Sequence, residues 1–232
     1  FKDMAEQLDN LIHKVYEAKI KEQSLIAESR QAQMQALQMQ INPHFLYNTL
    51  DSINWMALMA GNEEVSEMIL ALGQLFRSNM NTSGIYAKVS NAVENVRLYM
   101  YLQQVRFEEG LEYQIEVEDD VKDAMILKNL IQPLVENSIS HGIKSLKREG
   151  VIRLKIHRKG KGVYVSILDN GIGMSAEQIK ELKKSLESRE EYGTHVGLAN
   201  VDRRLVLAYG KQAELHIVSR IGQGTCVYFR IP

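Results

Sequence analysis

The sequence has few of the residues that crosslink small domains or interrupt helices. Its single cysteine, Cys226, excludes an intramolecular disulfide and is typical of a reducing compartment. No apolar run approaches the roughly 18 residues that a membrane-spanning helix needs, and no signal peptide is recognisable. The chain has 3 prolines, and residues 1–40 contain neither proline nor glycine. These absences predict a chain of soluble type that begins with a long helix.

The chain also has no marked excess of positive or negative charge, with 28 basic and 29 acidic residues and a net charge of -1. No basic patch with interleaved aromatic residues occurs, which argues against nucleic acid as a partner. Hydrophobic residues make up 45% and charged residues 25% of the 232 residues. This composition is that of a folded protein, and the length is sufficient for two small domains.

Residues 1–40 show a heptad pattern when position a is placed at Phe1. The a and d positions are then apolar except for Glu22 and Ser29, which predicts a coiled-coil helix. The alternative is a long amphipathic helix packed on its own chain. Because FKDMAEQL is already in helical phase at the start, we expect the chain to be a piece of a longer protein.

Helical patterns continue after the coiled coil. One runs from Pro43 to Met59 or Ala60 and ends at a Gly61-Asn62 turn. Two more cover about 63–80 and 91–107. The segment 41–109 therefore predicts an antiparallel helical hairpin, which two chains could pair into a four-helix bundle.

From residue 110 the pattern changes to short strands that alternate with helices. Strands are expected at 111–118, 151–158, 163–169, 213–219 and 225–231. Helices are expected at about 127–142, 175–188 and 198–209. This order predicts a second domain, 110–232, with a mixed sheet that carries helices on one face. The fold class is thus α+β, in more than one domain.

The helical stretch LIQPLVENSISHGI (130–143) carries the first polar cluster of this domain. Asn137 and His141 are four residues apart and share one helix face. A carboxamide oxygen is a suitable ligand for Mg²⁺ that keeps its waters and binds substrate phosphates. Taken alone, this segment is most simply explained with Glu136 and Asn137 as ordinary solvated residues.

The second cluster, LDNGIGM (168–174), places Asp169 at the end of an apolar strand. A buried carboxylate there can accept a hydrogen bond from an exocyclic amine. Gly171 and Gly173 permit close backbone approach and positive φ. A plain strand-to-turn sequence is the competing interpretation.

The third cluster, YGTHVGLANVDRRLVLAYG (192–210), is a glycine-bearing loop that runs into a helix. Backbone N–H groups at such a loop and helix start are suited to phosphate. The later stretch GQGT (222–225) precedes the last strand and, alone, is most simply a hairpin turn.

A proline and a histidine lie side by side in QINPHFLYNTL (40–50). A proline inside a helix costs about 3 kcal/mol, so Pro43 predicts either a kink that controls the exposure of His44 or a new helix start capped by Asn42. Asn48 lies one turn beyond His44, and its amide can therefore reach the same face. A lone histidine is otherwise most often a structural residue.

In this order and spacing, the clusters resemble the N, G1, G2 and final Gly-Thr boxes of the Bergerat-fold ATP-binding domain. That fold is common to sensor kinases, Hsp90-type chaperones and mismatch-repair ATPases. With NPHFLYNTL, residues 30–232 resemble the LytS/YesM-like bacterial sensor histidine kinases, and FKDMAEQL resembles the end of a HAMP linker. The resemblance implies that Asn137 binds the Mg²⁺ that bridges the ATP phosphates, and that Asp169 binds adenine, with Gly171, Gly173 and Thr225 around it. It further implies that Gly193, Gly197 and Asn200 belong to a lid over the phosphates and that His141 lies beside the nucleotide. His44 would be the phosphoacceptor.

The sequence departs from the family pattern at two positions. His195 stands where the lid motif has its middle glycine, which bears on lid flexibility and ATP affinity. Phe45 stands where the commonest sensor kinases carry an acid after the histidine, although the LytS-like group has an apolar residue there. Glu136 is then a candidate for the base that orients His44. Pro133 occupies the position of the water-activating glutamate of hydrolysing relatives, which favours transfer over hydrolysis.

The resemblance implies a homodimeric histidine kinase that uses ATP and Mg²⁺ to phosphorylate His44. The phosphoryl group would pass to an aspartate in the receiver domain of a response regulator, and Asn48 would position water in the reverse reaction. The chain would be the cytoplasmic portion of a membrane sensor, attached through a missing N-terminal part. The alternatives are a degenerate nucleotide-binding dimeric module, favoured by His195 and Phe45, and a Bergerat-type ATPase.

Overall fold

A computed structural model of the protein describes residues 21, 43–80, 84–107, 110–146, 148–188 and 196–232. The chain divides into two compact units, Phe1–Met56 and Ala57–Pro232, which are described separately. Apart from Lys21, the predicted coiled coil over 1–40 lies outside the described residues. Within the described part, no helix combines the length and the apolar content that crossing a membrane requires.

Helix α2 (Pro43–Met59) carries most of the described residues of the first unit. Two hydroxyls bond back to the preceding turn, with Thr49 Oγ1 donating to the carbonyl of Phe45 and Ser52 Oγ to that of Asn48, both at 2.8 Å. The predicted helix end at Met59 or Ala60 is confirmed. Both interpretations of Pro43 stay predictions, because the residues before it are not described.

A tight turn after α2 leads into α3 (Glu63–Met80), which lies in the second unit. Gly61 has φ 68°, a conformation that costs a residue with a Cβ atom about 1–2 kcal/mol. The side chain of Asn62 accepts a hydrogen bond from the Val65 N–H at 3.1 Å and thereby caps the helix. The predicted turn and the helix over 63–80 are confirmed.

Helix α4 (Val89–Arg106) contacts elements on both of its sides. On one side, Asn95 Nδ2 donates to Ser78 Oγ of α3 at 2.6 Å, and the Tyr101 hydroxyl donates to Glu67 of α3 at 3.2 Å. On the other side, its buried residues join the core of the sheet; they are Val89, Val93, Val96 and Met100. The domain boundary at 109/110 stays a prediction, but α4 shares its core with the segment that follows that boundary.

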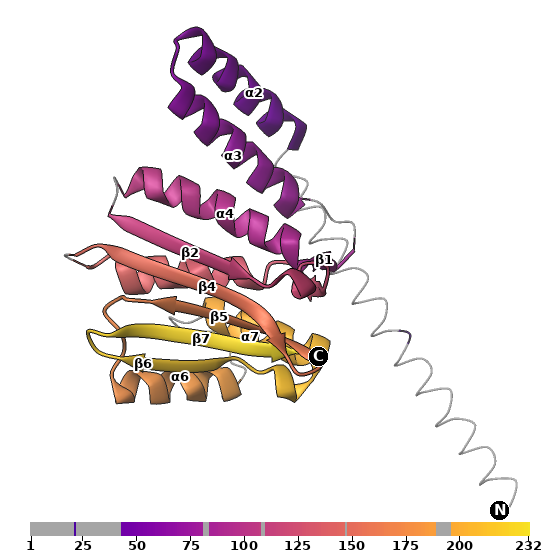
Figure 1. The fold of residues 1–232 in the computed structure, drawn as a ribbon, viewed down its shortest axis with the longest axis vertical. Helices are drawn as coiled ribbons and strands as arrows, with labels where there is room; N and C mark the ends of the chain where they lie inside the picture. The colour runs from indigo at the N-terminus through magenta and orange to yellow at the C-terminus, as the bar shows by residue number, and fades with distance from the viewer. Residues whose placement is uncertain (1–20, 22–42, 81–83, 108–109, 147, 189–195) are drawn as a thin grey trace, which may run out of the picture. The chain divides into compact units, whose positions relative to one another are not determined.

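Five strands form one mixed sheet (Figure 1). They are β2 (Leu111–Val117), β4 (Gly150–Lys159), β5 (Gly162–Asp169), β6 (His216–Arg220) and β7 (Gly224–Ile231). The spatial order is β2-β4-β5-β7-β6; β2 and β4 are parallel, and the other neighbours are antiparallel. The predicted mixed sheet is confirmed, with β7 inserted between β5 and β6.

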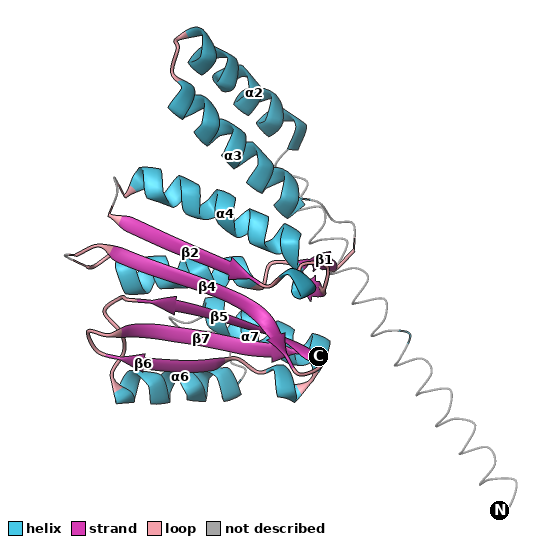
Figure 2. Cartoon of the chain, in the orientation of Figure 1, coloured by secondary structure: helices cyan, strands magenta, loops and turns pink. Residues whose placement is uncertain are grey.

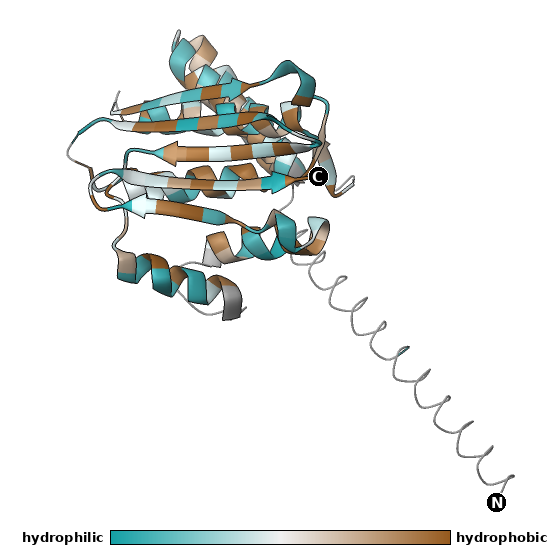
Figure 3. Ribbon diagram, turned by 60° about the horizontal axis from the view of Figure 1, so that its bottom comes forward, coloured by the Kyte–Doolittle hydropathy of each residue, from teal (hydrophilic) through white to brown (hydrophobic). Residues whose placement is uncertain are grey.

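One face of the sheet is covered by helices and the other is open. The helices of this unit after α4 are α5 (Ile131–Asn137), α6 (Ala176–Ser188) and α7 (Val196–Tyr209). Figure 2 shows helices in cyan and the strands of the sheet in magenta. Hydrophobic and hydrophilic residues alternate along the strands in Figure 3, as expected for a sheet with one buried face. On the open face four rings follow one another across the strands at centroid distances of 4.9, 5.5 and 5.0 Å: His157, Tyr164, Tyr228 and His216.

Several element bounds differ from those predicted. The helix expected over 127–142 begins at Ile131, because β3 (Met125–Leu127) pairs instead with β1 (Tyr86–Lys88), a strand distant in sequence. The last helix begins at Val196, earlier than expected. The strand expected from 213 begins at His216, after a 3₁₀ turn over Lys211–Ala213; a similar turn covers Asp119–Val121.

Two leucines of α7, one buried and one exposed, allow the contribution of the core to stability to be tested. Leu205 is 0% exposed, whereas Leu207 is 77% exposed. We expect Leu205→Ala to lower the free energy of unfolding by about 2–5 kcal/mol, because it leaves a cavity. Leu207→Ala should change it by less than about 0.5 kcal/mol. Urea unfolding followed by circular dichroism measures both, and equal losses would contradict the described packing of α7.

Candidate functional site

Asp169 ends β5 on the helix-covered face of the sheet and is only 2% exposed. Its Oδ1 atom accepts hydrogen bonds from the backbone N–H of Gly171 at 2.9 Å and of Thr225 at 3.1 Å. Burial raises the pKa of this carboxyl above its ordinary value, while the N–H of Gly171, the Ser138 hydroxyl and the N–H of Thr225 oppose the shift. The site therefore holds a buried acceptor in a fixed orientation.

Two glycines let the backbone close around this carboxylate. A Cβ atom on Gly142 would lie 3.0 Å from Oδ1 of Asp169, and one on Gly171 would lie 2.7 Å from the same atom and 2.6 Å from the backbone of Gly142. The N–H of Ile172 also donates to the carbonyl of Gly142 at 3.0 Å. The turn after β5 and the segment after α5 are thus in direct contact around Asp169.

Glycines with positive φ join this turn to the β6–β7 hairpin. Gly173 has φ 68°, and a Cβ there would lie 1.8 Å from the carbonyl oxygen of Arg220; Gly224 has φ 98°, and its Cβ would lie 1.9 Å from the carbonyl oxygen of Asp169. Neither contact is possible for another residue without a backbone shift. The requirement for a glycine at 173 agrees with the prediction made from the sequence.

The hairpin offers a matched test of this packing. Gly222 and Gly224 both have positive φ, but a Cβ on Gly222 meets nothing within 4 Å. We expect Gly222→Ala to lower the free energy of unfolding by about 1–2 kcal/mol, which is the conformational cost alone. Gly224→Ala should cost at least ~1 kcal/mol more, because the backbone at Asp169 must move. Thermal unfolding of both variants measures the difference, and equal melting temperatures would contradict the close approach.

The helix next to Asp169 changes its winding at the predicted polar cluster. Helix α5 ends at Asn137 and continues as the π-helical segment η2 (Ser138–Ile143), in which the N–H of Lys144 bonds the carbonyl of Ile139 at 2.9 Å. Ser138 is buried, at 4% exposed, Asn137 is half-buried and His141 is exposed. Single π turns inside helices occur frequently at functional sites.

Glu136 is held by its own helix and lies near α4. Its carboxylate accepts a hydrogen bond from Gln132 Nε2 at 2.8 Å. Burial raises the pKa of Tyr99 to about 12, and the negative charge of Glu136 adds to that shift. The carboxylate of Glu136 is therefore held beside α4, where it can act as a hydrogen-bond acceptor.

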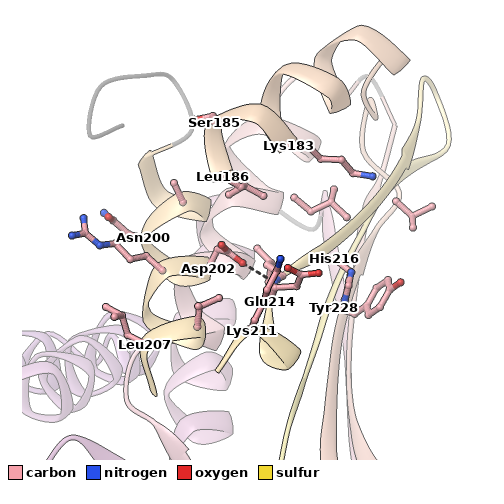
Figure 4. A pocket seen from close by; sticks show the side chains of 16 residues that line it. Lys183, Ser185, Leu186, Asn200, Asp202, Leu207, Lys211, Glu214, His216 and Tyr228 are labelled. Atoms are coloured by element: carbon pink, nitrogen blue, oxygen red, sulfur yellow. Dashed lines mark hydrogen bonds between the residues drawn. The ribbon is translucent and has the colours of Figure 1, made fainter. Parts of the chain in front are cut away.

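The structure does not bring all the predicted residues together. Gly193, like His195, lies outside the described residues. Gly197 is exposed and lies in the first turn of α7, where an added Cβ would meet nothing within 4 Å. Asn200 lines a separate cavity of about 1010 Å³ between α6, α7 and β6, shown in Figure 4; no other predicted site residue lines that cavity.

Three residues of the Asp169 cluster were not singled out from the sequence: Ser138, Gly142 and Ser219. Ser138 and Gly142 follow Asn137 in the same motif. The small hydroxyl side chain at 138 and the glycine at 142 could therefore have been recognised from the sequence. Ser219 pairs with Thr225 across β6 and β7, and only the strand register reveals that neighbour.

His44 and Asn48 form a pair on exposed positions of α2, in the first unit. Asn48 Nδ2 lies 3.2 Å from His44 Nδ1, as the one-turn spacing predicts. With the Asn48 amide turned so that its oxygen faces the ring, the carboxamide would accept the Nδ1 proton. The Nε2 atom would then carry the lone pair of the ring.

Two family models match the chain. Residues 32–111 match the histidine kinase model, and residues 122–232 match the model of the histidine kinase-, DNA gyrase B- and HSP90-like ATPases. The second match contains the whole Asp169 cluster. Within the part of the chain that the structure describes, no group of three or more His, Cys, Asp or Glu residues could hold a metal ion.

Relatives of known name are similar over almost the whole chain. Sensor histidine kinase YesM of Bacillus subtilis is 36% identical over 222 residues, which is 95% of this chain and 36% of YesM. Sensor protein kinase HptS of Staphylococcus aureus is 28% identical over 99% of this chain and 42% of HptS. The chain therefore spans less than half the length of these relatives.

Among solved structures, the histidine kinase domain of the blue-light activated kinase from Erythrobacter litoralis EL346 aligns with 82% of this chain and 95% of its own. Its identity is 16% and its TM-score 0.47, too low to add to the assignment. The two domain models and the similarity to YesM and HptS agree with the cluster around Asp169 and with the His44 motif. The chain therefore belongs to the sensor histidine kinases of the LytS/YesM-like group.

Proposed function

We propose that this chain binds ATP in the cluster around Asp169 and transfers the γ-phosphoryl group to His44. The observation that carries the proposal is the buried carboxylate of Asp169, whose Oδ1 is held by the N–H groups of Gly171 and Thr225. A preoriented acceptor of this kind suits the exocyclic amine of adenine. The segment that contains it matches the ATPase family model.

Mg²⁺ would be bound through Asn137, at the start of the π-helical segment. An ion that keeps several waters and is held mainly by substrate phosphates needs few protein ligands. The lack of a larger acidic or histidine cluster in the described residues is compatible with such a site, and the neutral oxygen of Asn137 is a suitable donor. When bound, the ion would neutralise charge on the phosphates.

His44 would act as the nucleophile. Its Nε2 forms a bond to the γ-phosphorus while the bond from that phosphorus to the β,γ-bridging oxygen breaks and ADP leaves. Asn48 lies against the other ring nitrogen, with its Nδ2 atom 3.2 Å from Nδ1. With the amide turned so that its oxygen faces the ring, Asn48 would accept a proton from Nδ1 and leave the lone pair on Nε2. Glu136 is proposed as an alternative partner for the imidazole, and His141, Gly197 and Asn200 as residues near the nucleotide; Gly193 is proposed for the lid.

The similarity to histidine kinases supports a proposal for the partners. The chain would act as a homodimer, with residues 1–40 as a coiled coil and the helices of 41–109 in a four-helix bundle, followed by the nucleotide-binding domain of 110–232. The phosphoryl group would pass from His44 to an aspartate of a response regulator receiver domain. The parent protein would be a membrane sensor of which this chain is a cytoplasmic portion.

Incubation of the purified chain with γ-³²P-labelled ATP and Mg²⁺ tests the proposal. A phosphoramidate at histidine is labile in acid and stable in base, whereas a phosphoester shows the opposite behaviour in acid. We expect protein-bound label that is lost in acid, together with ADP. Nucleotide binding without any covalent label would support the degenerate module instead, and release of phosphate without label would support an ATPase.

A further inference from the structure

Three polar side chains lie in one row across neighbouring strands, on the helix-covered face of the sheet. Asp169 of β5 is paired with Thr225 of β7, and Thr225 is paired with Ser219 of β6. The same face carries buried Ile167, Val227 and Ile217 in the adjacent row. Ser219 is therefore the next side chain in this row after Asp169, which is proposed to bind adenine, and Thr225, which the family resemblance places beside the adenine.

The hydrogen bonds of Ser219 fix the direction of its own proton. Its Oγ lies 2.9 Å from the carbonyl oxygen of Gly224, and a carbonyl can only accept, so the single hydroxyl proton of Ser219 is donated there. The same Oγ accepts the backbone N–H of Met174 at 2.9 Å. Ser219 has then no proton left for Thr225.

This arrangement also fixes the proton of Thr225. The two hydroxyl oxygens are 2.8 Å apart, and since Ser219 cannot donate, Thr225 Oγ1 must be the donor of that bond. Thr225 keeps only lone pairs for any other partner. Because the Asp169 carboxylate is also an acceptor, the two side chains together present acceptors and no donor.

We propose that Ser219 is a positioning residue for base specificity: by taking the hydroxyl proton of Thr225, it makes the site accept a purine with an amino group at C6 and reject one with an oxygen there. This inference rests on the proposed ATP binding and extends it. A 6-amino group offers two N–H donors to the two acceptors, whereas a 6-oxo group would place a third acceptor against them. Unpaired acceptors in a buried site discriminate strongly between such ligands.

The test compares ATP with inosine triphosphate, which carries oxygen at C6. Isothermal titration gives both dissociation constants for the whole chain, for Ser219→Ala and for Ser219→Thr. In Ser219→Ala the Thr225 hydroxyl is free to turn and donate to the 6-oxo group, so the ratio of the two constants should fall roughly 5- to 10-fold. Ser219→Thr keeps the hydroxyl and should restore the ratio of the unchanged protein. Ser166→Ala, on the opposite face of β5, is the matched control.

The ratio separates positioning from mere stability, because a loosened fold weakens both ligands alike. An unchanged ratio in Ser219→Ala overturns the inference while leaving ATP binding intact. If Ser219→Ala does not fold, Thr225→Val replaces it: loss of the hydroxyl should lower the ratio similarly, and an unchanged ratio again overturns the inference. Failure of the unchanged protein to bind ATP would instead defeat the proposed function, and the inference with it.

Discussion

His44→Gln should abolish the acid-labile label completely while ATP still binds with an affinity within about twofold of that of the unchanged protein. Glutamine keeps a polar side chain on this exposed position of α2 but has no nitrogen lone pair that can attack phosphorus. The Asp169 cluster lies in the other unit and does not include His44. Autoradiography after incubation with γ-labelled ATP, and titration calorimetry with ATP, measure the two properties.

The matched control is His216→Gln, an exposed histidine on the open face of the sheet. This variant should keep its label, because the residue lies on the face opposite Asp169. Label that survives in His44→Gln would assign the phosphoacceptor to another residue. Loss of ATP binding in His44→Gln would show that the substitution acts through the fold.

Asp169→Asn should lower ATP affinity about 10- to 100-fold, the range expected when a hydrogen bond to a charged group is lost. The asparagine oxygen can still accept the N–H groups of Gly171 and Thr225 that now bond Oδ1. Its NH₂ group would then face the adenine amine, and two donors would oppose each other. Titration calorimetry with ATP and Mg²⁺ measures the loss.

The same variant should be more stable than the unchanged protein at neutral pH. Burial raises the pKa of the Asp169 carboxyl, so its ionised form is disfavoured in the folded state. A raised pKa contributes stability below the ordinary carboxyl pKa, and that stability is lost as pH rises through the raised value. The advantage of Asp169→Asn is therefore largest above the raised pKa and shrinks as the pH falls through it.

Urea unfolding at several pH values tests this sign. Asp202→Asn is the control, because burial also raises the pKa of Asp202 while its carboxylate bonds the N–H of Leu215, away from Asp169. The control should share the gain in stability but keep ATP affinity. A variant Asp169→Asn that is less stable at neutral pH would mean that the lost charge had been stabilising the fold.

Much of the fold was predictable because the strands have a strict alternation. Leu154, Ile156, Val165 and Ile167 are buried every second residue, and that period alone indicates which face is covered. Asp169 followed from its place at the end of such a strand. Gly173 followed from the need for positive φ, which the structure confirms at 68°.

Features that depend on distant partners were not predictable. Met125–Leu127 looks like the start of a helix until its pairing with Tyr86–Lys88 is known. The π-helical winding after Asn137 has no separate signature in an otherwise helical pattern. The hydroxyl of Ser219 acquires its role only through the register of β6 on β7.

The position of β7 has a consequence for synthesis of the protein. It is the last of the five strands along the chain, yet it lies between β5 and β6, so until β7 has been made one edge of β5 is unpaired and β6 has no partner strand. Asp169 likewise lacks the Thr225 donor until then. If the proposed site is correct, a ribosome-bound chain that has not reached this strand would lack the completed site, so closure of the sheet and acquisition of nucleotide binding would occur together.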